Sequence, residues 1–422
     1  MNKQTQFSRR HLLKLLGLGV GFSALKHTTA FAAERPHVVV VGGGFSGATL
    51  SKYLKKWGGS SVDVTLVEIN STYVSPILSN LVLNGQKSVS DLSFSYQTLG
   101  QKYNINIVHD RVTAVDKTTQ TVSLAGGQSL VYDRLVLAPG IDFIEIAGLD
   151  YDKVPHAWKA GAQTDLLKSQ IEAIGDGGHF VMTIPKAPYR CPPGPYERAC
   201  VVADYLLNAK GLNVQVTVLD QNSAITVEAD TFGQKFSEYG ISYIPNAEVV
   251  AVDSDQKIVS YQIDGATTQN LQADVLNVIP NQRAGELVFL AGVNQGNWAP
   301  VNPLSYESTV ASNIHIIGDA QGTAMPKAGH IGNSEAKVCA DAILRSLNGI
   351  APDPAPKTNS ACYSPVSRTE ASWLTAVYEY RSDKGQMLLV SGANYPKSSA
   401  PSTRNYQDMF NWSGNLFSDT FA

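Results

Sequence analysis

The chain has 422 residues, of which 43% are hydrophobic and 16% charged, as is ordinary for a globular protein of two or three domains. Its net charge is −3, and removal of residues 1–32, which contain basic but no acidic side chains, would change it to −8. This acidic balance argues against nucleic acids and anionic membrane surfaces as partners and would suit a cationic protein. The four cysteines form neither a disulfide framework nor a metal-site spacing, so we expect no metal.

Residues 1–32 predict an export signal. A basic start with Arg9 and Arg10, a short apolar run and an A-x-A site ending at Ala32 are typical of a signal peptide. The segment "SRRHLLK" resembles a twin-arginine signal, the alternative being a Sec signal that carries two arginines. Because the apolar run is too short to span a bilayer, we expect a periplasmic protein, exported folded, without a membrane anchor.

Residues 37–47 predict a buried strand that runs into a glycine turn. Gly42, Gly44 and Gly47 give the pattern G-x-G-x-x-G, and a predicted helix and a second strand ending at Glu68 follow. The glycines allow the backbone to approach a pyrophosphate, whose charge the helix N-terminus attracts. Glu68 can accept hydrogen bonds from ribose hydroxyls, and its charge disfavours the 2′-phosphate of NADP. The sequence therefore predicts a dinucleotide site.

Two later segments favour FAD as this dinucleotide. "YDRLVLAPGI" is a predicted strand that ends in a turn with Pro139 and Gly140, and "IHIIGDAQG" is one that ends in Gly318 and Asp319. Both segments recur in flavoproteins with two dinucleotide-binding domains, which the chain resembles. In those proteins the acid of the Gly-Asp pair meets the ribityl or phosphate region of the flavin.

The expected fold class is α/β, with two Rossmann-like domains and a small α+β domain. The predicted segments are a twin-arginine signal peptide (1–32), the first part of an FAD-binding domain (33–142), an inserted domain with an NADH-domain-like fold (143–282), the second part of the FAD-binding domain (283–356) and a C-terminal interface domain (357–422).

The inserted domain departs from the usual nucleotide site in its first turn. A strand is predicted at 177–185, and a glycine-rich turn should follow it. The chain instead reads "YRCPPGPYERAC" at 189–200. Prolines stiffen this loop and lack the N–H groups that a second pyrophosphate needs. We therefore expect no NAD(P)H binding, and the loop presents Cys191 where a nicotinamide would otherwise meet the flavin.

Five segments together resemble the flavoprotein subunit of flavocytochrome c sulfide dehydrogenase. They are "PYRCPPGPYERA", "HAWKAG", "NVIPNQRAG", "GDAQGTAMPKAG" and "ACYSP". The resemblance runs from about residue 36 to the C-terminal end. It implies an FAD enzyme that oxidises hydrogen sulfide and passes electrons to cytochrome c, either as a c-type cytochrome subunit or as a soluble protein.

The resemblance also implies roles for single residues. Cys191 and Cys362 match a redox-active disulfide beside the flavin, and Glu197 matches a proton acceptor. Lys327 is expected near the flavin, and Trp412 beside it on the electron path. The alternatives are a structural disulfide and a helix N-terminal acid at Glu197 that the helix dipole favours.

One segment departs from the family. Characterised members can tether FAD through a cysteine in a segment that here reads "TYVSPILSN" (72–80), with Pro76 at the matching position. Ser75 beside it is no thioether donor, so we expect non-covalent FAD. Cys200 and Cys339 have no counterpart in the resemblance and are expected as buried thiols in helices.

Two other functions stay open. A sulfide:quinone oxidoreductase shares the fold but usually carries C-terminal amphipathic helices for the membrane, and the tail after 357 reads as polar and turn-rich without a basic amphipathic stretch. A non-catalytic FAD-binding redox sensor or assembly protein is the second. The aromatic residues of the tail indicate either an interface or a small β-layer core. The chain has no C-x-x-C-H motif for a c-type haem of its own.

Overall fold

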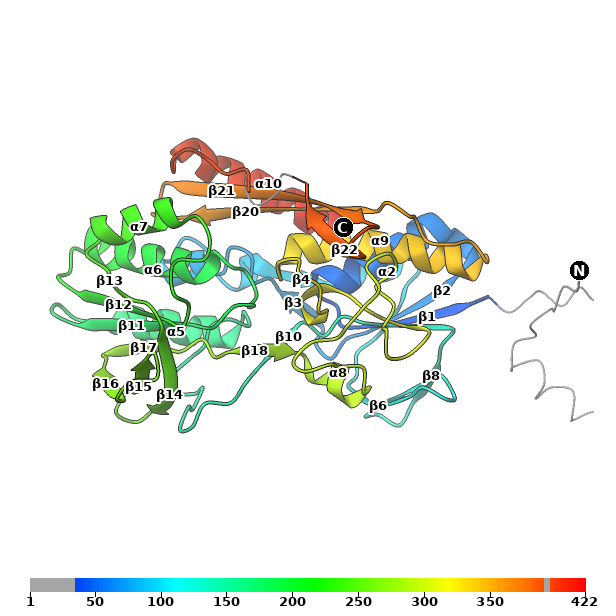
Figure 1. The fold of residues 1–422 in the computed structure, drawn as a ribbon, viewed down its shortest axis with the longest axis horizontal. Helices are drawn as coiled ribbons and strands as arrows, with labels where there is room; N and C mark the ends of the chain where they lie inside the picture. Colours follow the sequence, from blue (N-terminus) through cyan, green and yellow to red (C-terminus); the bar gives the residue numbers. More distant parts are fainter. Residues whose placement is uncertain (1–34, 391–394) are drawn as a thin grey trace, which may run out of the picture. The chain divides into compact units, whose positions relative to one another are not determined.

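The computed structural model describes residues 35–390 and 395–422, and the predicted signal peptide lies outside this range. The described residues form two parallel sheets, each with helices on one face and a small antiparallel sheet on the other (Figure 1). This arrangement confirms the predicted α/β class with two Rossmann-like domains.

The first domain contains a five-stranded parallel sheet with the order β19-β9-β1-β2-β5. Its strands are β1 (His37–Val41), β2 (Asp63–Val67), β5 (Asn106–Val108), β9 (Arg134–Leu137) and β19 (Ile314–Ile316). Helices α2 (Phe45–Gly58) and α9 (Gly329–Leu347) cover one face; β6 (Val112–Asp116), β7 (Thr121–Leu124), β8 (Ser129–Val131) and α8 (Glu286–Leu290) cover the other.

The central strand β1 is apolar throughout because both of its faces are buried. Val38 and Val40 pack in one core with α2 and α9. Val39 and Val41 pack in a second core with β7, β8 and α8. The carboxyl end of β1 is thereby fixed at the turn that leads into α2, where ligands bind in this class of sheet.

The inserted domain repeats this plan with a four-stranded parallel sheet in the order β13-β12-β11-β17. Its strands are β11 (His179–Ile184), β12 (Gln215–Asp220), β13 (Ser242–Ile244) and β17 (Val275–Asn277). Helices α5 (Ala162–Ala173), α6 (Gly194–Asp204) and α7 (Ala229–Glu238) cover one face; β14 (Ala247–Asp253), β15 (Ile258–Ile263) and β16 (Gln269–Gln272) cover the other.

The two connections between the domains run side by side as an antiparallel pair of β10 (Ile141–Phe143) and β18 (Gln282–Ala284). The remaining short elements are η1 (Gly59–Ser61), β3 (Thr72–Val74), α3 (Asn80–Leu83), η2 (Ser90–Leu92), β4 (Ser93–Ser95), α4 (Gln97–Tyr103), the π-helical turn η3 (Tyr205–Ala209) and η4 (Gly318–Ala320).

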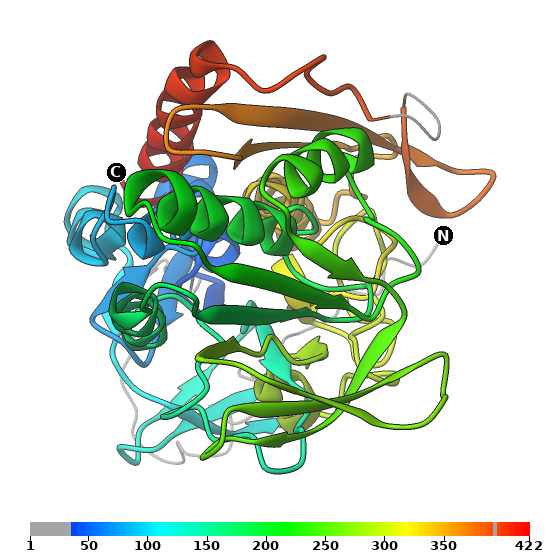
Figure 2. The same cartoon turned by 90° about the vertical axis from the view of Figure 1, so that its left-hand side faces the viewer.

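The C-terminal region combines an antiparallel sheet with one helix. They are β20 (Lys357–Pro365), β21 (Ala371–Arg381), β22 (Gln386–Leu389) and α10 (Thr403–Phe421). Strand β20 contacts both α9 of the first domain and α6 of the inserted domain. Figure 1 and Figure 2 show β20, β21 and α10 together along one side of both sheets. This layer therefore brings residues of the tail to the junction of the two domains.

The expectation of a turn-rich tail is wrong, because its last part is the 19-residue helix α10. Met409, Leu416 and Phe421 lie on its buried face. Phe417 and Phe421 pack on the ring of Phe94, with centroid distances of 4.8 and 4.9 Å. These aromatic residues thus belong to the protein's own core. Within the described residues, no helix is long and apolar enough to cross a membrane.

Candidate active site

A cavity of about 520 Å³ opens at the carboxyl ends of β1 and β2, a size typical of ligand sites. The turn from β1 into α2 forms its floor. Gly42 has φ +103°, and a Cβ there would lie 2.3 Å from the carbonyl oxygen of Ala138. A Cβ on Gly47 would lie 1.9 Å from the carbonyl oxygen of Gly42. Backbone contacts therefore require Gly42 and Gly47, whereas a Cβ on Gly44 would meet only the ring of Tyr73, at 3.3 Å.

The first turn of α2 is suited to bind an anion. Its N-cap residue Gly44 supplies no capping side chain, and the turn carries no acidic residue. The amide groups at this helix end are therefore free of side-chain partners and can bind a pyrophosphate. Glu68 lines the same cavity and accepts hydrogen bonds from the amides of Gly43 (2.7 Å) and Asn70 (3.0 Å).

The other predicted dinucleotide residues lie around this cavity. Pro139, Gly140, Gly318 and Asp319 all line it, and burial raises the pKa of the Asp319 carboxyl. A glycine cradle, a free helix N-terminus and carboxylates at the edge are the donor and acceptor set that FAD requires. The residues present therefore fit FAD.

Lys327 lies outside the lining of this cavity. Its ammonium group donates to the carbonyl oxygens of Asp319 (2.9 Å) and Gln321 (2.7 Å) and lies 3.6 Å from the ring centroid of Trp298. Burial lowers the pKa of Lys327 to about 8. Its own carbonyl oxygen accepts a hydrogen bond from the amide of Cys191 (2.7 Å). The residue therefore contributes by holding the cysteine loop against the first domain.

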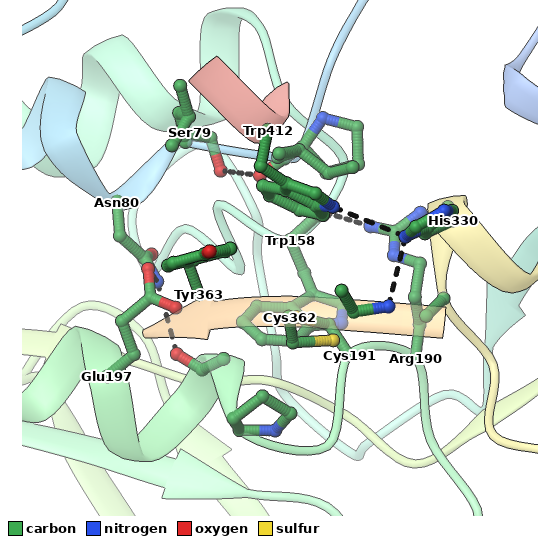
Figure 3. Close-up of a pocket in the computed structure, with 18 residues that line it drawn as sticks. Ser79, Asn80, Trp158, Arg190, Cys191, Glu197, His330, Cys362, Tyr363 and Trp412 are labelled. Carbon is green, nitrogen blue, oxygen red and sulfur yellow. Dashed lines mark hydrogen bonds between the residues drawn. The ribbon is translucent and has the colours of Figure 1, made fainter. Parts of the chain in front are cut away.

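A second, more enclosed cavity contains both predicted redox cysteines (Figure 3). Cys191 comes from the loop before α6, and Cys362 comes from β20. The cavity adjoins the dinucleotide cavity, because both are lined by Pro76, Arg190, Ala328 and Gly329. Its other lining residues are Ile77, Leu78, Ser79, Asn80, Trp158, Pro193, Gly194, Glu197, His330, Ala361, Tyr363 and Trp412.

The loop holds Cys191 in an uncommon backbone conformation. Its φ is +56°, in the left-handed region that side chains other than glycine rarely adopt. The amide of Gly194 donates to the carbonyl oxygen of Cys191 (2.9 Å), which closes a tight turn. The prolines before Gly194 make this turn rigid. Strain of this kind is common at functional sites.

Both cysteines are free thiols in the structure. Burial raises the pKa of Cys191, and Cys362 and Glu197 add to this effect, whereas Arg190 opposes it. Burial raises the pKa of Cys362 to about 12, with contributions from Glu228 and Glu197. A thiolate in this cavity is therefore costly unless its charge is compensated.

Glu197 occupies the first turn of α6, as predicted, and is 7% exposed. Burial raises the pKa of its carboxyl to about 8, and a hydrogen bond from Asn80 opposes this shift. The neighbouring Arg198 donates to amide and carbonyl oxygens, including those of Asn80 (2.9 Å) and Ala157 (2.6 Å). Glu197 is therefore a buried acid that can gain and lose a proton near neutral pH.

Trp412 of α10 lies in the wall of the cysteine cavity. Its indole N–H donates to Nδ1 of His330 (3.3 Å), which also accepts from the amide of Ala361 (3.0 Å). The rings of Trp412 and Tyr363 are 5.5 Å apart. These contacts connect α10 to the residue that precedes Cys362.

The lining residues without a predicted role include Asn80, Trp158, His330 and Tyr363. Trp158 lies in "HAWKAG" and Asn80 ends "TYVSPILSN", so the family segments included both without assigning them a function. Cys200 and Cys339 are fully buried in α6 and α9, as predicted. Among the described residues, no group of three His, Cys, Asp or Glu side chains is placed to hold a metal.

Three family profiles match successive parts of the chain. Residues 36–171 match pyridine nucleotide-disulphide oxidoreductases, residues 164–280 the central part of the sulfide dehydrogenase [flavocytochrome c] flavoprotein chain, and residues 354–421 the flavin-binding part of flavocytochrome c sulphide dehydrogenase. The flavoprotein chain of this enzyme from Chlorobaculum thiosulfatiphilum is 53% identical over 45 residues, which are 11% of this chain and 92% of that sequence. The chain belongs to the flavocytochrome c sulfide dehydrogenase flavoprotein family.

This family membership confirms the resemblance and makes the protein an FAD-dependent oxidoreductase of a sulfide-oxidising family. The sulfide-quinone reductase of Aquifex aeolicus is 22% identical over 350 residues, which are 77% of this chain and 80% of that protein. The solved sulfide:quinone oxidoreductase from Aquifex aeolicus has a TM-score of 0.76 at 19% identity and covers 92% of both chains. The flavoprotein family and the quinone reductases thus share one fold.

Proposed function

We propose that this protein is a periplasmic sulfide dehydrogenase that oxidises hydrogen sulfide through a Cys191–Cys362 disulfide and FAD and passes the electrons to a c-type cytochrome. The observation that carries the proposal is the meeting of two cysteines, from segments far apart in sequence, in one cavity that adjoins the dinucleotide cavity. A purely structural cysteine pair would not need a rigid loop that holds the backbone of Cys191 in the left-handed conformation.

The first step is thiol–disulfide exchange. Hydrosulfide attacks one sulfur of the disulfide, so the cysteine–cysteine bond breaks and a new sulfur–sulfur bond forms. One cysteine becomes a persulfide, and the other keeps the electron pair as a thiolate. The apolar walls, which include Trp158 and Tyr363, exclude water from these species.

Glu197 accepts the proton in this scheme. Because burial raises its pKa to about 8, the carboxylate has a proton affinity suited to a general base near neutral pH. The proton that leaves the hydrosulfide or the persulfide therefore stays within the cavity.

FAD, when bound, supplies an acceptor for two electrons that can be returned one at a time. The chain's own residues hold it in place. The glycine turn around Gly42 and the N-terminus of α2 bind the pyrophosphate, and Glu68 and Asp319 lie at the edge of the cavity. With Pro76 where some family members have a tethering cysteine, we propose that FAD is bound without a covalent link.

NAD(P)H has no corresponding site in this proposal. In a second dinucleotide domain, the acid at the end of the second strand binds the ribose. Here that residue is Asp220, which is fully buried and accepts hydrogen bonds from the hydroxyls of Tyr196 and Tyr243, both at 2.8 Å. Its carboxylate is thus already used within the protein.

The electron acceptor separates the two family branches. The family name implies a cytochrome partner, and we propose a c-type cytochrome. The helix α10 is amphipathic but not basic, and its apolar face packs on the first domain, which disfavours membrane docking. Sulfide-driven turnover should be fast with cytochrome c and slow with a soluble quinone analogue. The reverse order of rates would favour a quinone reductase.

Anaerobic titration with sulfide tests the cysteine pair. Cys191→Ser and Cys362→Ser should each retain FAD but lose most sulfide-dependent flavin reduction, and the double variant should be little worse, because residues that act as a unit are not additive. If the disulfide were only structural, each variant would instead lose about 3–5 kcal/mol of stability, and the folded variant would still react normally with sulfide. Folded single variants with wild-type flavin reduction would end the proposal.

The periplasmic location rests on residues 1–32 alone. Fractionation of cells that produce the full chain should recover the protein in the periplasm with a new N-terminus at Ala33. Recovery in the cytoplasm with residues 1–32 intact would contradict this part of the proposal.

A further inference from the structure

The side chain of Asn80 lies between the general base and a buried arginine. It is 6% exposed at the start of α3. Its Nδ2 group donates to Oε1 of Glu197 (2.8 Å) and to the carbonyl oxygen of Gly194 (3.1 Å). Its Oδ1 atom accepts from Nε of Arg198 (2.9 Å). One amide therefore connects Glu197, the turn next to Cys191 and Arg198. Figure 3 shows Asn80 beside Glu197.

Arg198 fixes which way this amide points. An arginine can only donate hydrogen bonds, so the atom of Asn80 that faces it must be the oxygen. The NH₂ group must then face Glu197. In the reverse orientation the NH₂ group of Asn80 would face the N–H group of Arg198, and its oxygen would face the carboxylate oxygen of Glu197. Neither pair could form a hydrogen bond.

Arg198 is itself held rigidly. Its NH1 group donates to the side chain of Asn277 (2.9 Å) and its NH2 group to the carbonyl oxygen of Ala157 (2.6 Å). Its guanidinium lies 4.9 Å from the ring centroid of Trp158. The direction of the Asn80 amide is therefore set by a buried network that extends into the inserted domain.

We propose that Asn80 is a positioning residue for sulfide oxidation, which orients the Glu197 carboxylate in the cysteine cavity and stabilises its ionised form so that it can take the proton of hydrosulfide. This proposal rests on the role of Glu197 as the proton acceptor.

Of the groups around Glu197, Asn80 favours the ionised carboxylate most. Burial disfavours the ionised carboxylate, and the hydrogen bond from Asn80 is the largest influence that favours it, ahead of the charge of Arg198. Glu228, before α7, disfavours it. Cys191 and Cys362 face the same cavity, where burial raises the pKa of both thiols.

The test is the pH profile of flavin reduction by sulfide, measured anaerobically by stopped flow on the FAD-loaded protein. Asn80→Asp keeps the shape of the side chain and an acceptor for Arg198 but cannot donate to an ionised Glu197. Asn80→Leu removes both contacts. In Asn80→Leu the pH of half-maximal rate should rise by about one unit, because loss of a hydrogen bond to a charged group changes the pKa of that group by about that much. In Asn80→Asp it should rise by at least as much, because the added negative charge also disfavours an ionised Glu197. The rate at pH 7 should fall about tenfold and recover at alkaline pH.

Asn84→Leu provides a matched control. Asn84 directly follows α3, is 3% exposed and donates to the side chain of Gln86 (2.7 Å), without contact to Glu197. Its variant should keep the wild-type pH profile. The ionisation of hydrogen sulfide affects every variant equally, so differences between profiles report on the protein. Melting temperature and FAD content show whether each variant is folded.

Glu197→Gln separates failure of this inference from failure of the proposed function. If Glu197→Gln keeps the rate and the profile of the wild type, Glu197 is not the proton acceptor and both ideas fail. If Glu197→Gln lowers the rate and keeps only the pH dependence that hydrogen sulfide itself imposes, but a folded Asn80→Asp protein has an unmoved profile, only the role of Asn80 fails. A loss of rate in Asn80→Asp by the same factor at every pH, without alkaline recovery, would equally overturn it.

Discussion

Replacing Glu197 with glutamine should change how the stability of the protein depends on pH. Glutamine has the shape of a protonated glutamic acid and can still be a partner for Asn80. It carries no charge at any pH. The variant therefore removes the cost of an ionised carboxylate in a buried position while keeping the local packing.

The expected size of the effect follows from the pKa. Burial raises the pKa of Glu197 from an ordinary value of 4.5 to about 8. A group whose pKa is raised in the folded state contributes stability that is fully present below pH 4.5 and is lost as the pH rises through 8. A shift of this size corresponds to roughly 5 kcal/mol over the whole range and about 4 kcal/mol between pH 5 and pH 9.

The assay is urea unfolding of the wild type and Glu197→Gln at several pH values between 5 and 9, with FAD in excess. Other buried acids, such as Glu335 and Glu228, have raised pKa values through burial as well. Both proteins contain these acids, so their contributions cancel when the free energy of unfolding of the wild type is subtracted from that of the variant. The variant should become more stable relative to the wild type as the pH rises, with most of the change between pH 5 and pH 8. A difference in the free energy of unfolding that stays constant with pH would refute the assigned pKa of Glu197.

Three further predictions concern the two nucleotide sites. Acid precipitation should release FAD into the supernatant, because Pro76 stands where a tethering cysteine can occur; yellow colour in the pellet would contradict this. NADH and NADPH should bind weakly or not at all, since Asp220 is occupied by two tyrosine hydroxyls, and a micromolar dissociation constant for either would disprove it. Gly47→Ala should yield a destabilised protein with little FAD, because the added Cβ would lie 1.9 Å from the carbonyl oxygen of Gly42; normal FAD content after purification would show that the turn adapts.

The sequence predicted the elements that follow from local pattern. The glycine turn at Gly42, the strands that end near Gly140 and Gly318, and the position of Glu197 at the start of a helix are all placed correctly, because strand ends and helix starts depend on nearby residues. The buried thiols Cys200 and Cys339 are also placed correctly.

The errors and omissions concern contacts between distant segments. Polar and small residues separate the apolar positions of α10, so the local pattern favours a turn-rich tail, and the helix depends on its packing against the first domain. Lys327 donates to the carbonyl oxygens of Asp319 and Gln321, contacts that the sequence does not reveal, and its position near the flavin stays a prediction. Asn80 had no assigned role because its hydrogen bonds reach residues more than 100 positions away, which no spacing along the chain reveals.

The origin of the cavity walls has a consequence for biosynthesis. Cys191 comes from the inserted domain, Cys362 from β20 and Trp412 from α10. The segments that form the cavity walls are therefore synthesised one after another. Although domains generally fold from the N-terminal end during synthesis, the first domain is complete only with β19 and α9, which follow the inserted domain and directly precede β20 in the chain. The cofactor cavity and the cysteine pair should therefore be completed almost together, near the end of synthesis.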